Sequence, residues 1–143
     1  TGYENTFVGH RAGSGTSSGN GTGYKNTGVG NVSLEDIREG HHNTAIGDSS
    51  AVDIGTGIYN TMIGAAAGVA TEYADFNTFV GAMAGWDNNR TNNRTDANRN
   101  TYMGYLSGAS NREGEDNAGF GAFSGYGRAD RTTEGGEGFT YFN

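Results

Sequence analysis

Apolar and polar positions along the chain follow a repeated five-residue pattern, Asn-Thr-x-aliphatic-Gly, in which x varies. The successive copies begin 21, 17, 17, 17, 23 and 17 residues apart, so 17 residues is the basic unit. A unit this short cannot hold two helices and a turn, and its short apolar stretches bounded by Gly and Asn are typical of strands. The pattern therefore predicts an all-β chain: one parallel β-solenoid domain over residues 1–143, with about seven 17-residue coils that start near Asn5, Asn26, Asn43, Asn60, Asn77, Asn100 and Asn117.

Stacked coils place equivalent residues in columns, about 4.8 Å from one coil to the next. Successive side chains of a strand point to opposite faces. The aliphatic column is apolar in every unit, so we expect it to face the core together with the Thr column, and the variable column between them to face outward. We also expect positive φ at the Gly, a buried small residue seven positions after each Asn, and side-chain hydrogen bonds along the Asn column.

Composition narrows the classes of function. The chain has 27 glycines, no proline and no cysteine, and its net charge is −7. The missing cysteines exclude disulfides, thiolate zinc sites and thiol nucleophiles, and an acidic chain without a basic stripe argues against nucleic acid as a partner. Because no apolar run is long enough to span a bilayer, we expect no membrane insertion. No cofactor or metal is indicated, since the histidines (His10, His41, His42) lack a clear ligand spacing.

The segments NTFVGHRAG and NTMIGAAAG resemble the head repeats of trimeric autotransporter adhesins and the related repeats of phage tail fibres and other surface fibres. The resemblance covers nearly the whole chain. It implies a left-handed parallel β-roll, three chains side by side, and a non-enzymatic role in attachment to a surface, a glycan or a matrix receptor. It further implies an extracellular location, on a cell or a virion, within a longer fibre. Adhesin head repeats are usually a little shorter than 17 residues, and their stalk and membrane anchor do not occur in this sequence.

An apolar patch is expected at one Gly corner. The variable column and the column six residues after each Asn both become more apolar toward the C-terminus, and exposed apolar patches mark interfaces. We therefore predict a subunit interface formed by Met62, Phe79, Met83, Tyr102, Leu106 and Phe123.

Three units carry extra residues in the same half of the repeat, at 14–23, 87–99 and 127–138. The middle segment is rich in Asn and Arg, which suit sugars or carboxylates, and loops on rigid scaffolds often bind ligands. We predict a ligand-binding loop formed by Asn89, Arg90, Asn92, Asn93, Arg94 and Arg99.

Two other functions stay open, a filament subunit without a ligand and a polysaccharide-cleaving fibre. The second needs a pair of carboxylates at a suitable separation, which Asp48, Asp53, Glu72, Asp75, Glu115 and Asp116 offer in kind. Ice binding through the Thr column is disfavoured, because it needs that column to face outward.

Overall fold

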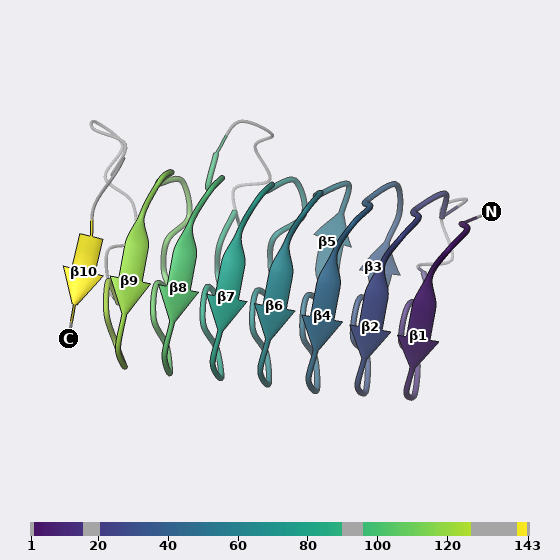
Figure 1. The fold of residues 1–143 in the computed structure, drawn as a ribbon, viewed down its shortest axis with the longest axis horizontal. Coiled ribbons are helices and arrows are strands. Elements are labelled where there is room, and N and C mark those ends of the chain that lie inside the picture. The colour runs from purple at the N-terminus through teal and green to yellow at the C-terminus, as the bar shows by residue number, and fades with distance from the viewer. Residues whose placement is uncertain (1, 16–20, 90–95, 127–139, 143) are drawn as a thin grey trace.

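The computed structural model describes residues 2–15, 21–89, 96–126 and 140–142, and within them it has ten short strands and no helix. Eight of the strands form one sheet in the order β1-β2-β4-β6-β7-β8-β9-β10, and two form a second sheet, β3-β5. Figure 1 shows the long sheet as a row of parallel strands, with β3 and β5 behind it. The first sheet comprises β1 (Thr6–Val8), β2 (Thr27–Val29), β4 (Thr44–Ile46), β6 (Thr61–Ile63), β7 (Thr78–Val80), β8 (Thr101–Met103), β9 (Ala118–Phe120) and β10 (Thr140–Phe142), and the second β3 (Asp36–Ile37) and β5 (Asp53–Gly55).

Every pair of neighbours in the long sheet is parallel and in the same register of the repeat. Thr44 of β4 pairs with Thr61 of β6, and Ile46 with Ile63, although 17 residues separate the partners in the chain. The 23-residue unit keeps the same strand register, since Thr78 still pairs with Thr101. The predicted parallel β-solenoid is confirmed, and each Asn-Thr-x-aliphatic motif forms the same strand of its coil.

The Asn column forms the predicted ladder of hydrogen bonds. Oδ1 of Asn43 accepts hydrogen bonds from the backbone N–H of Asn60, at 2.9 Å, and from its Nδ2, at 3.1 Å. Nδ2 of Asn60 also donates to the carbonyl of Ala74 at 2.8 Å. Each of these Asn residues from Asn26 onward is buried. One side chain thus joins three successive coils through groups that would otherwise lack partners in the interior.

The Gly that follows each strand forms the predicted corner. Gly64 has φ +135°, and a Cβ there would lie 2.6 Å from the carbonyl carbon of Gly81 in the next coil. Only glycine fits both the backbone angle and the close approach. Seven residues after each Asn, the small residues of the inner coils are buried as predicted, and Ser50 Oγ donates to the Met62 carbonyl at 2.9 Å.

The predicted direction of the strand side chains is wrong. The variable column faces inward, with Ala45, Met62 and Phe79 completely buried and Tyr102 2% exposed. The aliphatic column faces outward, together with the Thr column between it and the Asn ladder. Its most exposed members are Val8 at 58%, Ile46 at 41%, Met103 at 40%, Ile63 at 37% and Phe120 at 37%.

The inward-facing column can vary in size because glycines leave room in the core for its larger side chains. A Cβ added at Gly28 would lie only 2.9 Å from the ring of Phe7 in the preceding coil. A Cβ added at Gly119 would lie at the same distance from the ring of Tyr102. Toward both ends of the rod a ring in one coil is thus matched by a glycine in the next, whereas in the middle Met62, Phe79 and Tyr102 follow one another, each packed against a glycine of its own coil. Both arrangements keep the interior close-packed. The rings of Phe79 and Tyr102 stack at 5.6 Å in the middle of this core.

Candidate interaction surface

The long sheet presents one continuous uncharged surface to solvent, which we call the outer face. It consists of the Thr column and the aliphatic column, and neither contains a charged residue. Both columns point outward along the sheet, with the Thr side chains mostly half-buried against their neighbours. In-register pairing keeps each column straight, so the outer face repeats with the period of the coils.

The predicted subunit interface divides into two groups. Met62, Phe79 and Tyr102 are core residues, so the prediction of an outward position is wrong for them. Met83, Leu106 and Phe123 lie at the Gly corner, where Met83 and Phe123 are exposed and Leu106 is half-buried. Exposed aromatic side chains surround this second group. Together these residues form a set that we call the C-terminal apolar edge: Met83, Trp86, Tyr105, Leu106, Phe123 and Tyr126.

An aromatic stack runs along the other side of the outer face, next to the Asn ladder. The rings of Tyr3 and Tyr24 are parallel at 4.9 Å, and those of Tyr59 and Phe76 at 5.4 Å. His41 and His42 join the two pairs, by stacking on Tyr24 and Tyr59 respectively. Because each ring covers the face of its neighbour, the stack offers ring edges to solvent rather than the flat faces on which a sugar would stack.

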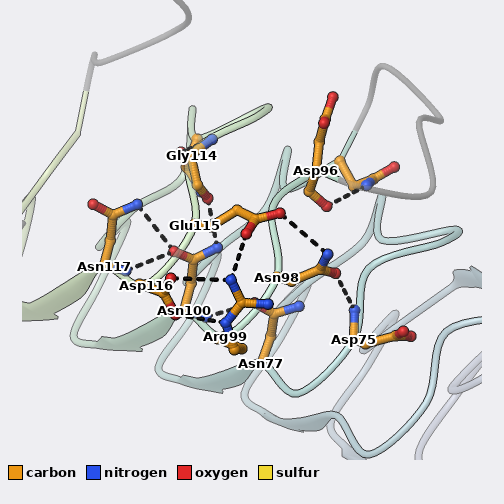
Figure 2. A network of polar contacts seen from close by, with 12 residues as sticks. Asp75, Asn77, Asp96, Asn98, Arg99, Asn100, Gly114, Glu115, Asp116 and Asn117 are labelled. Atoms are coloured by element: carbon orange, nitrogen blue, oxygen red, sulfur yellow. Dashed lines mark hydrogen bonds and ion pairs between the residues drawn. The ribbon is translucent and has the colours of Figure 1, made fainter. Parts of the chain in front are cut away.

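The same side of the rod is ionic toward the C-terminus (Figure 2). Arg99 Nε donates to Asp116 Oδ1 at 2.6 Å, and its guanidinium also pairs with Glu115 of the next coil. Arg99 lowers the pKa of Asp116, and the two carboxylates raise the pKa of Arg99. Asn98 connects this network to the preceding coil, because its Oδ1 accepts from the Asp75 N–H at 2.7 Å.

The predicted ligand-binding loop is described only at its ends. Asn89 is completely buried and donates to the Asp96 carbonyl at 2.8 Å, so its side chain faces inward, and its contact with a ligand stays a prediction. Arg99 is exposed but forms ion pairs with neighbouring carboxylates. The other four residues, Arg90, Asn92, Asn93 and Arg94, lie outside the described residues.

A group of buried polar residues that was not predicted lies at the base of this loop. Asn88 is completely buried, donates to the Ala97 carbonyl at 3.0 Å and accepts from Asn111 Nδ2 at 3.1 Å. Arg112 pairs with Asp87 at 3.0 Å. Asn88 and Asn111 each follow the Asn of their unit by 11 residues, a buried position that Ile37, Ile54 and Thr71 occupy in earlier coils, so this column changes from apolar to polar along the rod. These contacts close the coil around the inserted residues.

Most of the candidate carboxylates hold structural contacts, and Glu115 and Asp116 share the guanidinium of Arg99. Glu72 pairs with Arg38, Asp75 accepts from the Ile58 N–H at 2.8 Å, and Asp48 accepts from Asn31 at 2.8 Å. Asp53 differs, because its Oδ1 is buried without a hydrogen-bond partner. Burial, and then the charge of Asp36, which is its strand partner, raise the pKa of Asp53.

Two further features of the described residues are a pair of adjacent histidines and a hollow at one end of the rod. His41 Nδ1 lies 3.0 Å from His42 Nδ1, and burial followed by His42 lowers the pKa of His41. Within residues 2–15, 21–89 and 96–126, no three His, Asp or Glu side chains gather as a metal site. A hollow of about 480 Å³ lies at the β1 end of the rod, lined by residues such as Tyr3, Asn5, Phe7 and Ile37. No helix among the described residues could cross a membrane.

The geometry places the chain in the class of parallel β-solenoids with an Asn ladder. No protein family, curated protein or solved structure matches the chain. The features of its surface therefore carry the functional argument.

Proposed function

We propose that the chain is a non-enzymatic rod segment of an extracellular fibre, assembled from three copies side by side, that supports attachment to a surface, glycan or matrix. The observation that carries the proposal is the regularity of the stack. All coils pair in one register, and the Asn ladder joins them from Asn5 to Asn117. A stack of this kind is stiff and can be lengthened coil by coil, which suits a part that holds a binding site away from a surface.

The first experiment measures the solution mass by light scattering on a sizing column at two concentrations. A species of three chains of 14.9 kDa, about 45 kDa, supports side-by-side assembly. Concentration-dependent growth into long particles would favour the filament subunit without a ligand, and a monomer at every concentration would contradict the assembly.

The second experiment tests attachment with a glycan array and immobilised matrix proteins. Binding that is lost in Arg90→Ala and Arg94→Ala variants supports the adhesive role. A matched Arg11→Ala variant, which removes a cation that pairs with Glu35 away from this loop, should retain binding. Turnover of a polysaccharide, abolished by substitution of one carboxylate, would instead favour the cleaving fibre.

A further inference from the structure

We infer that His41 and His42 together bind one copper(II) ion through the Nδ1 atoms of their two imidazole rings. The pair lies in the aromatic stack beside the outer face, and the inference does not depend on the fibre assembly proposed above. Adjacent histidines show no metal-ligand spacing in the sequence, and it is the folded coil that brings their nitrogens together.

The first argument concerns the distance between the two donor atoms. Nδ1 of His41 lies 3.0 Å from Nδ1 of His42. Bonds from a metal ion to imidazole nitrogen are about 2.0–2.1 Å long, so one ion bound to both atoms would have an angle of about 95° between its two bonds. A tetrahedral ion such as zinc(II) needs about 109°, which separates the nitrogens by about 3.3 Å. An angle close to 90° favours the tetragonal ions copper(II) and nickel(II), of which copper(II) binds more tightly.

The second argument concerns how the two rings are held. His41 stacks on Tyr24 with ring centroids 4.5 Å apart, and His42 stacks on Tyr59 at 4.6 Å. The backbone is fixed as well, because the His42 N–H donates to the Tyr24 carbonyl and the Tyr59 N–H to the His41 carbonyl, each at 3.1 Å. The φ of His42, 60°, interrupts the alternation of an extended chain and lets two consecutive rings lie on one side of the coil. Since both rings already stand in place, binding orders little that was free.

The third argument concerns protonation and charge. An imidazole ring binds a metal ion only in its neutral form. Burial, and then the charge of His42, lower the pKa of His41, whereas the negative charge of Asp75 raises it, and the net effect keeps this ring neutral at pH 7. In a neutral pair one Nδ1 donates a hydrogen bond to the other. Copper(II) takes the place of that proton, which moves to Nε2 of the same ring. Asp75 and the net charge of −7 also attract a dication.

The two histidines fill only part of the coordination sphere. Among the described residues no third His, Asp or Glu side chain joins them. Both rings are half-buried and present their edges to solvent, so water completes the coordination. The site is therefore of the open kind, in which ligands exchange, and differs from a closed structural site with four protein ligands.

The experiment titrates the metal-free chain with copper(II) sulfate at pH 7.5 and measures the heat of binding by calorimetry. His41→Phe and His42→Phe each remove one donor and keep a ring in the stack, as Tyr24 and Phe76 do in the same columns of other coils. His10→Phe is the matched control, because its Nδ1 lies 3.0 Å from Asn31 Oδ1 instead. Copper(II) bound elsewhere on the chain is common to all four proteins and cancels in the comparison. Circular dichroism checks that each variant keeps the fold.

The wild-type chain and His10→Phe should bind one equivalent of copper(II) that His41→Phe and His42→Phe each bind at least about a hundredfold more weakly. The estimate follows because groups that merely orient a metal ligand already contribute about ten- to a hundredfold, and each variant loses a ligand itself. Similar losses of a few fold in all three variants would show independent binding by single histidines and would overturn the inference.

Electron paramagnetic resonance of the frozen complex tests the coordination directly. The copper(II) signal of the wild-type chain should be tetragonal and show coupling to two imidazole nitrogens, and this signature should be absent in His41→Phe and His42→Phe. Coupling to a single nitrogen in the wild-type chain would contradict chelation by the pair. Zinc(II) should bind at least about tenfold more weakly than copper(II), and equal affinities would contradict the angle argued from the N–N distance.

Discussion

Replacing Asn60 by alanine is the sharpest test of what holds the coils together. The substitution removes a side chain whose Nδ2 donates to the Ala74 carbonyl at 2.8 Å and whose Oδ1 accepts from the Asn77 N–H at 2.9 Å. Both backbone groups belong to completely buried residues, so water cannot replace the lost partner without opening the coil. A buried group without its partner costs about 2 kcal/mol, so the two together cost about 4 kcal/mol.

Asn31 provides a matched control, because it belongs to another inter-coil ladder on the surface. Its Nδ2 donates to Asp48 Oδ1 at 2.8 Å, and its side chain is exposed. Asn31→Ala should therefore cost less than about 1 kcal/mol, since water can satisfy the groups it leaves. The free energy of unfolding is measured for both variants by urea denaturation at one protein concentration. If Asn60→Ala lies within about 1 kcal/mol of Asn31→Ala, the Asn ladder is not the main link between coils.

Three further predictions follow from the geometry. Met62 and Ile63 are neighbours on β6 with opposite burial, so Met62→Ala should lower the free energy of unfolding by about 3 kcal/mol and Ile63→Ala by less than about 1 kcal/mol; equal losses would contradict the assigned faces. Gly64→Ala should cost at least about 3 kcal/mol or prevent folding, because its Cβ would meet Gly81; a variant as stable as wild type in the same urea experiment would refute this. The lowered pKa of His41 means that the unfolded chain binds more protons below pH 6.5, so the melting temperature should fall from pH 7.5 to pH 5.5; His41→Asn should reduce this fall, and an identical fall would contradict it.

The fold could be predicted from the sequence because the repeat is a property of the backbone. The 17-residue spacing, the Gly corners and the Asn column each describe a hydrogen-bonding or steric requirement that recurs in every coil. The directions of the side chains could not be predicted in the same way. Two columns of the strand contain apolar residues, and the more regular of the two, the aliphatic column, is the one that a periodicity argument assigns to the core. In this narrow coil the inner column is the variable one, because glycines make the space beside a large side chain: a Cβ at Gly28 would lie 2.9 Å from the Phe7 ring, and one at Gly85 would lie 2.5 Å from the Phe79 ring.

The candidate interaction surface and the polar residues beside it could also be predicted only in part. The exposed members of the predicted interface, Met83, Leu106 and Phe123, were found because their column is apolar near the C-terminus. Asn88 and Asn111 hold the same position in successive units, 23 residues apart, and could not be predicted as a buried pair because that column contains Ile37 and Ile54 in earlier coils. Only the folded coil shows that an insertion rich in asparagine directs part of its amide groups inward.

The Asn ladder also gives the rod a direction. In five of the six steps from Asn5 to Asn117, the side-chain amide of the later Asn donates to the side-chain oxygen of the earlier one, and in the step from Asn77 to Asn100 the backbone N–H of Asn100 donates instead. The side-chain dipoles therefore point the same way along the axis and polarise one another. A coil added upside down would set oxygen against oxygen or amide against amide. Any end-to-end growth of such a rod is thus head to tail, and each coil carries the orientation of the whole fibre.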